Sequence, residues 1–179
     1  MAHLFADEVN TVTELRDRLV QSGFNETCSI AVESLIFDAD NRLLLLRRGA
    51  SARDEVGKLE GIGGRADEST TLREELFREI AEEIGSDLKI EVLEFLEVKS
   101  DRALKVLPDG TEQWGTWVIA SYICRLVSGE PRIQEPDKNE GLERIANFAV
   151  DPSRLSSSCR QSLQALQREW RRVSELLAR

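Results

Sequence analysis

Residues 61–85 read GIGGRADESTTLREELFREIAEEIG, a glycine-rich loop that runs into a highly charged segment. Apolar residues recur in this segment at intervals of four, namely Leu72, Leu76, Ile80 and Ile84. The spacing predicts a helix over 71–84 with one apolar face that packs against a sheet. Thr71 is followed three residues later by Glu74, a capping-box signal which indicates that the helix begins directly after the loop.

The other face of this helix is nearly all charge. Glu79, Glu82 and Glu83 lie within one turn of one another, and Glu75 lies one turn earlier. Like charges at these spacings destabilise a helix, so the cluster is either a solvated acidic face or a site for a positively charged ligand. Mg²⁺ prefers oxygen ligands and often binds through a few carboxylates together with substrate phosphates. The glycine loop ahead of the helix and Arg78 beside Glu79 favour the cation site.

The composition indicates a small globular protein. Its 179 residues include 33 acidic and 24 basic side chains, and the net charge of −9 argues against a partner that is a nucleic acid polymer. No apolar run approaches the roughly 20 residues that cross a bilayer. Acidic residues at positions 7 and 8 interrupt any signal peptide, so no membrane partner and a cytoplasmic location are expected. The widely spaced Cys28, Cys124 and Cys159 indicate neither a disulfide framework nor a zinc site.

The flanking segments predict further helices and strands. Helical spacing of apolar residues predicts one helix over 10–19 and another from 153 to the end. Branched apolar runs predict strands over 29–37, 42–47, 88–98, 115–126 and 145–150. A turn is expected at Pro108-Asp109-Gly110. The apolar stripe of the last helix spans only about two heptads, so we expect it to pack on its own domain or on a dimer partner rather than to form a coiled coil.

The stretch from Gly64 to Ser86 resembles the Nudix box. That pattern is Gly, five residues, Glu, seven residues, then Arg-Glu-apolar-x-Glu-Glu-x-Gly-apolar. Residues 78–85, Arg-Glu-Ile-Ala-Glu-Glu-Ile-Gly, match its core without a gap. The departures are Thr70, where the pattern has its first Glu, and Ser86, where it has an apolar residue.

The resemblance implies a fold and a division of the chain. The expected fold is α/β (α+β), a Nudix-type α/β/α sandwich with a mixed sheet and an added C-terminal helix. We expect an N-terminal helical extension over 1–27, a Nudix hydrolase domain over 28–152 and a C-terminal helix over 153–179.

The resemblance also implies the roles of the charged residues. Glu79, Glu82 and Glu83 would bind divalent metal, Mg²⁺ or alternatively Mn²⁺. Arg78 would orient these carboxylates through charge-assisted hydrogen bonds. The chemistry would be substitution at phosphorus in a nucleoside diphosphate that carries another group. There the metal ions neutralise phosphate oxygens and help to generate a hydroxide nucleophile.

Thr70 is the departure that bears most on this site, because the family's Glu at that position supports the metal site and its loop. Asp67 and Glu68 lie two or three residues earlier, and either is a candidate to supply the missing carboxylate. Without such a replacement, metal binding would be weakened but not abolished.

Other residues are candidates for binding substrate. Gly63 and Gly64 would let the loop backbone approach the site closely. Arg48 and Arg53 lie before the box and are candidates for phosphate contacts, although basic residues at a strand end are commonly solvated. Trp117 is a candidate for stacking on a nucleobase, with packing in the core or hairpin as the alternative.

Arg47 and Trp114 are candidates for the same roles as Arg48 and Trp117. Arg47 precedes Arg48 and is expected to behave like it. Trp114 is expected to share one face of a strand with Trp117, so that either could meet the base.

A second loop resembles one that brings an acid to the metal centre in many Nudix hydrolases. It reads Glu135-Pro-Asp-Lys-x-Glu140 and precedes the last predicted strand. Glu140 is therefore our candidate for a further ligand or the general base, and an ordinary surface Glu is the alternative.

Family marks for particular substrates are missing. The proline typical of ADP-ribose enzymes and the tyrosine typical of dinucleoside polyphosphate enzymes are both absent beyond the box, where the chain reads Val98-Lys-Ser-Asp-Arg102. A nucleoside triphosphate hydrolase and a hydrolase of other nucleoside diphosphate derivatives stay open. So do a catalytically weakened Nudix domain that binds nucleotide as a regulatory module, an interaction protein acting through its last helix, and a homodimer.

Overall fold

The computed structural model describes residues 9–24, 27–106 and 109–178. In these ranges the helices are α1 (Val12–Gln21), α2 (Leu72–Ile84), α3 (Ser157–Arg168) and α4 (Trp170–Leu177), with a short 3₁₀ helix at Pro152–Arg154. The strands are β1 (Cys28–Phe37), β2 (Leu43–Arg48), β3 (Leu59–Glu60), β4 (Ile62–Arg65), β5 (Lys89–Val106), β6 (Glu112–Ser128) and β7 (Asn139–Ile145). The predicted helices at 10–19 and 71–84 and the predicted hairpin at 29–47 are confirmed.

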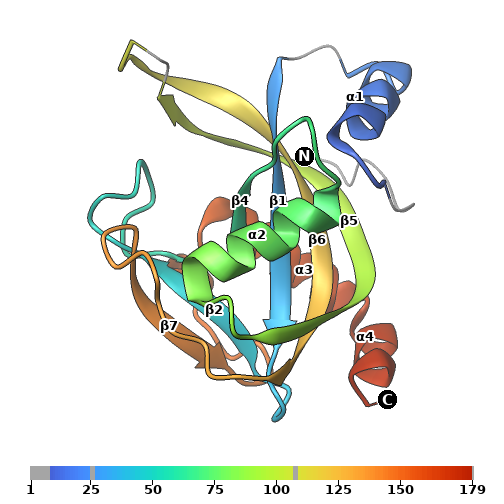
Figure 1. Ribbon diagram of the computed structural model, residues 1–179, viewed down its shortest axis with the longest axis vertical. Helices are drawn as coiled ribbons and strands as arrows, with labels where there is room; N and C mark the ends of the chain where they lie inside the picture. The colour runs from blue at the N-terminus through green and yellow to red at the C-terminus, as the bar shows by residue number, and fades with distance from the viewer. Residues whose placement is uncertain (1–8, 25–26, 107–108, 179) are drawn as a thin grey trace.

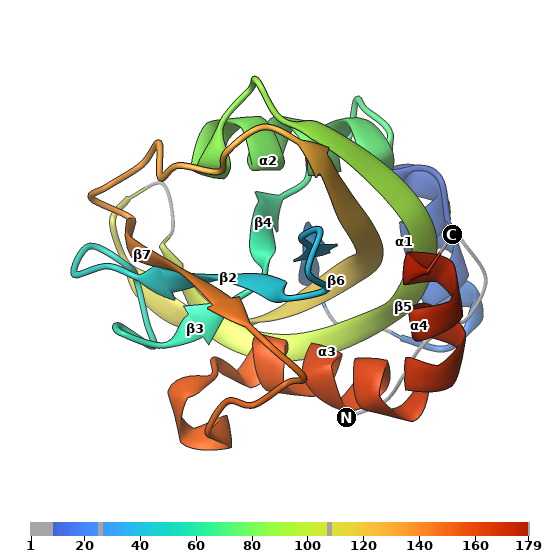
Figure 2. The ribbon, with the colours of Figure 1, turned by 90° about the horizontal axis from the view of Figure 1, so that it is seen from below.

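The strands form one curled mixed sheet with β1 at its centre. The order along its main path is β3-β2-β1-β6-β5, while β4 pairs with β1 and β7 pairs with β2. The β1–β6 pair is parallel and the other pairs are antiparallel. Helix α2 covers one face, whereas α3 and α4 cover the other (Figure 1 and Figure 2). The predicted α/β/α sandwich with a mixed sheet is confirmed.

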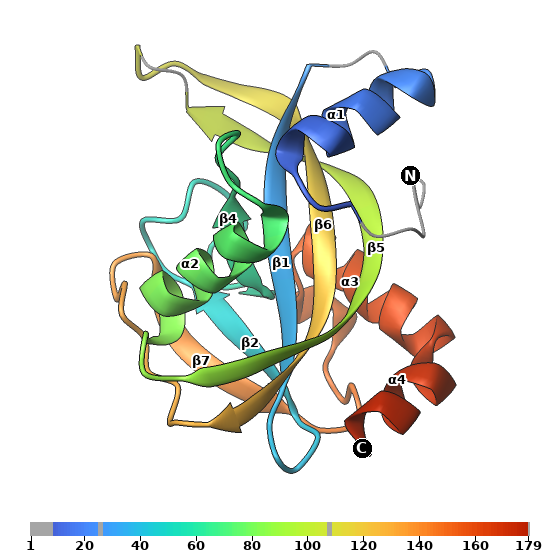
Figure 3. The same ribbon diagram turned by 45° about the vertical axis from the view of Figure 1, so that its right-hand side comes forward.

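Two apolar cores lie on the two faces of the sheet, because successive side chains of a strand point to opposite sides. From β1, Val32 and Ile36 enter the core beneath α2, which also buries residues of α1. Leu35 and Phe37 enter the core beneath α3 and α4. Helix α1 lies at one end of the sheet (Figure 3).

Local capping fixes the start of α2. The Thr71 hydroxyl accepts a hydrogen bond from the Glu74 N–H at 3.2 Å, and the Glu74 carboxylate accepts one from the Thr71 N–H at 2.9 Å. The predicted capping box is thus present. Gly85 ends the helix with a φ of 123°, a conformation that L side chains rarely adopt.

The strand predicted over 145–150 is wrong. The structure has β7 at Asn139–Ile145, and the chain then turns through Asn147 and Phe148, whose φ angles are 52° and 54°. Phe148 packs edge-on against Trp170 at 4.7 Å between ring centroids. Its apolar side chain therefore contributes to the core beneath α4 rather than to a strand.

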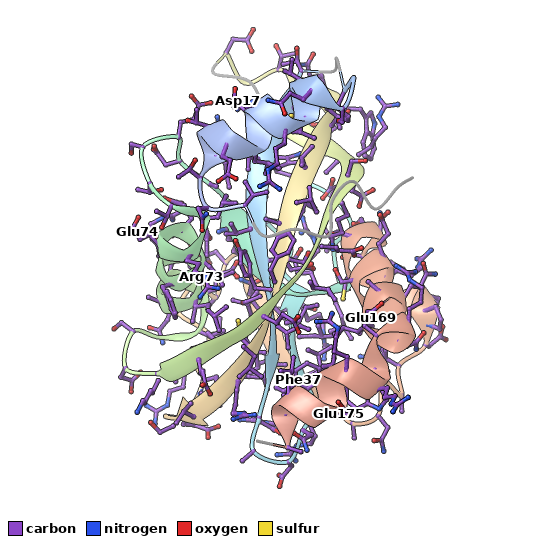
Figure 4. All side chains as sticks on the ribbon, turned by 90° about the vertical axis from the view of Figure 1, so that its right-hand side faces the viewer. Asp17, Phe37, Arg73, Glu74, Glu169 and Glu175 are labelled. Atoms are coloured by element: carbon purple, nitrogen blue, oxygen red, sulfur yellow. The ribbon has the colours of Figure 1, made fainter. Side chains whose placement is uncertain are left out.

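The single C-terminal helix is also a wrong prediction. The helical conformation is interrupted at Glu169, between α3 and α4, and no Gly or Pro stands there to signal the interruption. The break keeps Leu163 of α3 and Val173 of α4 in the same core. Trp170 lies 6.1 Å from Phe37 between ring centroids, and Figure 4 shows Phe37 near α4. The apolar stripe thus packs on the chain's own sheet.

The strand pair predicted at 88–98 and 115–126 is confirmed but longer than expected. Strand β5 extends to Val106 and strand β6 begins at Glu112. These two ends project from the body of the protein as a hairpin (Figure 1). Asp109 and Gly110 lie in the turn, and Pro108 lies outside the described residues. The three cysteines are buried thiols. None of the helices in the described ranges has the length and apolar character required to span a membrane.

Candidate active site

A cavity of about 400 Å³ is lined by residues of several elements, with Glu79 and Glu83 from α2 and Ser158 from the start of α3 among them. Its wall is formed by the glycine loop, the strands β1, β5 and β6, and the loop over 49–58. Glu60, Glu79 and Glu83 lie close enough for their charges to interact and form its acidic end, and its apolar lining includes Leu104, Trp117 and Ile119. Ligand pockets commonly have volumes of roughly 300–1,000 Å³, so this cavity can hold a small molecule.

Two glycines let the loop lie against the helix carboxylates. A Cβ atom on Gly63 would lie 2.1 Å from the carbonyl oxygen of Val32, so only glycine fits there. The Gly63 N–H donates to Glu83 Oε2 at 2.9 Å. A Cβ atom on Gly64 would lie 2.5 Å from Glu79 Oε2. Close approach of the backbone explains these glycines, because neither has a positive φ.

Glu79 and Glu83 are the buried acids that α2 contributes to the cavity, with 5% and 3% of their surfaces exposed. Burial and the nearby charge of Glu60 raise the pKa of Glu83 to about 8, against the opposing effect of the Gly63 N–H. Burial also raises the pKa of Glu79, although the charge of Arg78 opposes it. Burying a carboxylate is costly unless a cation compensates it, so this end of the cavity favours a positive ligand.

Arg78 joins the carboxylates of α2. It donates to Glu79 Oε1 at 2.6 Å, to Glu82 Oε2 at 2.8 Å and to the Arg65 carbonyl oxygen at 3.0 Å. The structure therefore places Arg78 in hydrogen-bond contact with both acids. Glu82 differs from the other two acids because its side chain is 48% exposed and does not line the cavity.

The carboxylates of α2 do not form a preorganised metal site. Among residues 9–24, 27–106 and 109–178, no three His, Cys, Asp or Glu side chains form a group that could hold a metal. Arg78 holds Glu82 away from the cavity and also binds Glu79. The donors facing the cavity are nevertheless carboxylate oxygens, which fit a hard divalent cation such as Mg²⁺.

The structure does not bring Glu140 to this acidic end. Glu140 is exposed, and its carboxylate lies 4.0 Å from Arg47 across β2. Neighbouring residues of a strand face opposite sides of the sheet. Asn139, which precedes Glu140, is therefore the residue that points inward, and its Nδ2 donates to Glu83 Oε1 at 3.4 Å. The prediction of Glu140 as ligand or base is thus corrected by the register of β7.

Lys138 lines the cavity and was not singled out from the sequence, although it belongs to the quoted loop. Its Nζ lies 4.0 Å from Glu83 Oε1 and 2.9 Å from Glu135 Oε2. Burial lowers the pKa of Lys138, but the hydrogen bond to Glu135 and the charge of Glu83 outweigh it, so the pKa is raised. Lys138 is a cation held beside the buried acids.

Arg48 and Arg53, the two arginines predicted to bind phosphate, differ in their surroundings. Arg48 donates to Asp54 Oδ1 at 2.9 Å and also pairs with Glu60, so internal carboxylates hold its guanidinium. Asp54 in turn accepts the Leu104 N–H at 2.8 Å, which ties the loop over 49–58 to β5. Arg53 is exposed on this loop and lines the cavity.

The two tryptophans lie on opposite faces of β6, which corrects the expectation of a shared face. Residues three apart on a strand have opposite orientations. Trp117 lines the cavity, paired across the sheet with Asp101. Trp114 is 58% exposed on the projecting hairpin.

A buried ion pair forms the floor of the cavity and was also missed. Glu33 Oε2 accepts hydrogen bonds from Lys99 Nζ at 2.7 Å, Ser121 Oγ at 2.8 Å and Ser162 Oγ at 2.5 Å. Lys99 also donates to the Ser158 carbonyl oxygen at 3.0 Å. The network joins β1, β5 and β6 to α3. Glu33 is the single charged residue of a largely apolar strand, and this was the available signal.

Neither candidate for the missing loop carboxylate reaches the site. Asp67 is exposed and accepts hydrogen bonds from the N–H and hydroxyl of Ser69. Glu68 pairs with Arg16 of α1 at 2.8 Å. The hypothesis that either replaces the acid at position 70 is therefore wrong.

The profile of the NUDIX domain matches residues 29–166 of this chain. A MutT NUDIX hydrolase from Burkholderia pseudomallei has a similar structure, with a TM-score of 0.60 and 26% sequence identity over 79% of this chain and 99% of the other. No curated protein sequence matches the chain.

Two further solved structures share the fold. The NUDIX domain of Shewanella oneidensis NrtR, complexed with ADP ribose, has a TM-score of 0.57 and 18% identity over 81% of this chain and 90% of the other. An ADP-ribose pyrophosphatase from Streptococcus suis has a TM-score of 0.54 and 18% identity over 81% and 93%. With the domain profile and the box at residues 64–86, they lead to one conclusion: the chain belongs to the Nudix family of hydrolases.

Proposed function

We propose that this chain is a Mg²⁺-dependent hydrolase that cleaves a pyrophosphate bond in a nucleoside diphosphate derivative, nucleoside triphosphates included. The observation that carries the proposal is one cavity whose lining combines an acidic end with an aromatic wall. Buried Glu79 and Glu83 belong to the acidic end, and Trp117 lines the same cavity. A nucleotide has the matching division, with charged phosphates at one end and a flat base at the other.

Glu79 and Glu83 are the residues that would hold the divalent cation, with Glu82 from the same helix completing the set if it turns from Arg78. When bound, Mg²⁺ or Mn²⁺ neutralises phosphate oxygens and makes water a better nucleophile. The preference for a hard cation follows from the all-oxygen donors.

The chain's own cations and aromatic wall would bind and orient the substrate. Lys138 beside Glu83 and Arg53 on the loop both line the cavity, where they would attract phosphate groups. Trp117 would stack on the base, since aromatic stacking tolerates any base. Arg48 would act indirectly, because its bonds to Asp54 hold the loop that carries Arg53.

A second candidate is a regulatory module that binds a nucleotide without cleaving it. Two observations favour it: Thr70 replaces the family acid, and Arg78 holds Glu82 outside the cavity. The NrtR domain in complex with ADP ribose is a Nudix domain observed with a bound nucleotide derivative. The two candidates differ in turnover and share the binding site.

The test is a phosphate-release screen in Mg²⁺ and in chelator over nucleoside triphosphates, ADP-ribose, nucleotide sugars and dinucleotides. We expect Mg²⁺-dependent release from one class by wild type and a loss of at least about 100-fold in Glu79→Gln. Glu74→Gln is the matched control, because Glu74 is exposed on the same helix (Figure 4) and Gln also serves in a capping box. Tight nucleotide binding without release would favour the regulatory module, and neither binding nor release would contradict both.

Three broader predictions are part of this proposal. The substrate is a small nucleotide rather than a nucleic acid polymer or a membrane lipid, in keeping with the net charge of −9. A cytoplasmic location and a homodimer remain predictions, to be checked by cell fractionation and by sedimentation of the full chain.

A further inference from the structure

Glu75 is a buried acid of α2 that lies outside the cavity. Only 2% of its surface is exposed, and it does not line the cavity wall. Both of its carboxylate oxygens are nevertheless occupied. Oε2 accepts hydrogen bonds from Arg78 Nη2 at 2.7 Å and Nε at 3.1 Å, and Oε1 accepts one from the Thr70 hydroxyl at 2.6 Å.

This arrangement connects two features of the Nudix box. Thr70 stands where the box has a glutamate, and Arg78 holds the acids Glu79 and Glu82. Because the Thr70 hydroxyl touches the Glu75 carboxylate, a carboxylate carried by position 70 would occupy nearly the same space. The negative charge is therefore present, but it comes from the helix instead of the loop.

We propose that Glu75 is a positioning residue which replaces the missing glutamate at position 70 and fixes the guanidinium of Arg78. The inference rests on the proposed function, since it concerns the same cation site. Glu75 occupies two donors of Arg78 and thereby limits how strongly the arginine competes with a metal for Glu79. Thr70 contributes by holding the second oxygen of Glu75, so the pair performs the role of one acid.

The charges around Arg78 explain why loss of Glu75 would weaken metal binding. One guanidinium is shared among Glu75, Glu79 and Glu82. Without Glu75, its freed donors would turn to the other two acids, and a cation would have to displace them. Partners that orient metal ligands typically change metal affinity by about 10-fold to 100-fold when they are removed.

The test measures the affinity of the full chain for Mn²⁺ by electron paramagnetic resonance, in the absence of nucleotide. We expect Glu75→Ala to weaken binding by about 10-fold or more. Thr70→Glu combined with Glu75→Ala moves the acid back to the loop, and it should recover most of that loss. Glu74→Ala is the matched control. It removes a neighbouring glutamate and the capping box but leaves Arg78 untouched, so it should lower the melting temperature and leave Mn²⁺ affinity within about 2-fold.

Two milder variants keep the test decisive if Glu75→Ala does not fold. Glu75→Gln keeps the shape and removes the charge, and Thr70→Val removes only the hydroxyl. Both should weaken Mn²⁺ binding, with the larger loss in Glu75→Gln. Thr70→Glu alone places two carboxylates together, so it should bind Mn²⁺ no more tightly than wild type.

Unchanged Mn²⁺ affinity in Glu75→Gln, or a double variant no better than Glu75→Ala, would overturn the inference. Its failure is separable from that of the proposed function, because no turnover is measured. Wild type that binds Mn²⁺ but hydrolyses nothing would contradict the hydrolase and leave the Glu75 result standing. Hydrolysis with Mn²⁺ affinity indifferent to Glu75 would contradict this inference alone.

Discussion

Replacing Glu83 by Gln should stabilise the metal-free protein at alkaline pH while removing a metal ligand. Burial raises the pKa of Glu83 from its ordinary 4.5 to about 8. The folded protein therefore retains a proton that the unfolded chain loses between these values. Stability consequently falls as the pH rises through this window, and Gln, which does not ionise, escapes the loss.

The magnitude follows from the two pKa values. At about 1.4 kcal/mol for each tenfold change in proton affinity, the raised pKa of Glu83 lowers the unfolding free energy by roughly 1.5 kcal/mol at about pH 5.5, where only the unfolded chain is ionised, and by roughly 4.5 kcal/mol at about pH 8.5. The unfolding free energy of Glu83→Gln relative to wild type should thus rise by about 3 kcal/mol between these pH values. Gln also keeps an oxygen that can accept the Gly63 N–H, so the loop contact survives.

The assay is urea unfolding in chelator at both pH values. Glu82→Gln is the control, because Glu82 is half exposed on the same helix and should show no comparable rise. Added Mg²⁺ should stabilise wild type at the higher pH and leave Glu83→Gln nearly unaffected. Parallel pH dependence of wild type and Glu83→Gln would contradict this prediction, since burial would then not raise the pKa of Glu83.

Three further substitutions test the loop, the floor and the aromatic wall of the cavity. Gly63→Ala places a methyl group 2.1 Å from the Val32 carbonyl oxygen, so it should cost about 3 kcal/mol or more in urea unfolding. An unchanged midpoint would contradict that contact. Lys99→Met leaves Glu33 buried without its cation and should cost about 3–5 kcal/mol near neutral pH, whereas replacing both residues by apolar ones should restore most of it. Trp117→Ala should raise KM for the nucleotide by about 10-fold or more, with Trp117→Phe close to wild type. Equal KM values in steady-state assays would exclude stacking.

Features with local physical causes were predictable from the sequence. The α2 helix follows from its apolar period of four and the capping pair Thr71 and Glu74, which need no information from the rest of the chain. The buried hairpin strands follow in the same way from their apolar runs. The glycine loop could be identified, although the reason for Gly63 is contact with a neighbouring strand, which only the fold reveals.

The errors arose where tertiary contacts decide the structure. Strand β7 begins at Asn139, which has little strand propensity, because pairing with β2 determines its register. That register also turned Glu140 outward and placed Asn139 at the site. The break at Glu169 follows from packing around Trp170, and its sequence carries no helix-breaking residue.

The missed site residues share a different cause. Glu33, Glu60 and Lys138 come from three segments far apart in the sequence, and only the curled sheet brings them to one cavity. Glu75 was noted as a further acid of the charged face, but its bond to Thr70 depends on how the loop returns to the helix. Spacing along one helix cannot show such a contact.

Metal binding by Glu79 and Glu83 can be observed directly in an anomalous diffraction map of crystals soaked in Mn²⁺. We predict a peak at the acidic end of the cavity, within about 2–2.5 Å of carboxylate oxygens of both Glu79 and Glu83. The peak should be lost in Glu83→Gln crystals of the same form. A map with no peak at this end, or with its strongest peak bound by other residues, would contradict the assignment of this cavity as the metal-dependent active site.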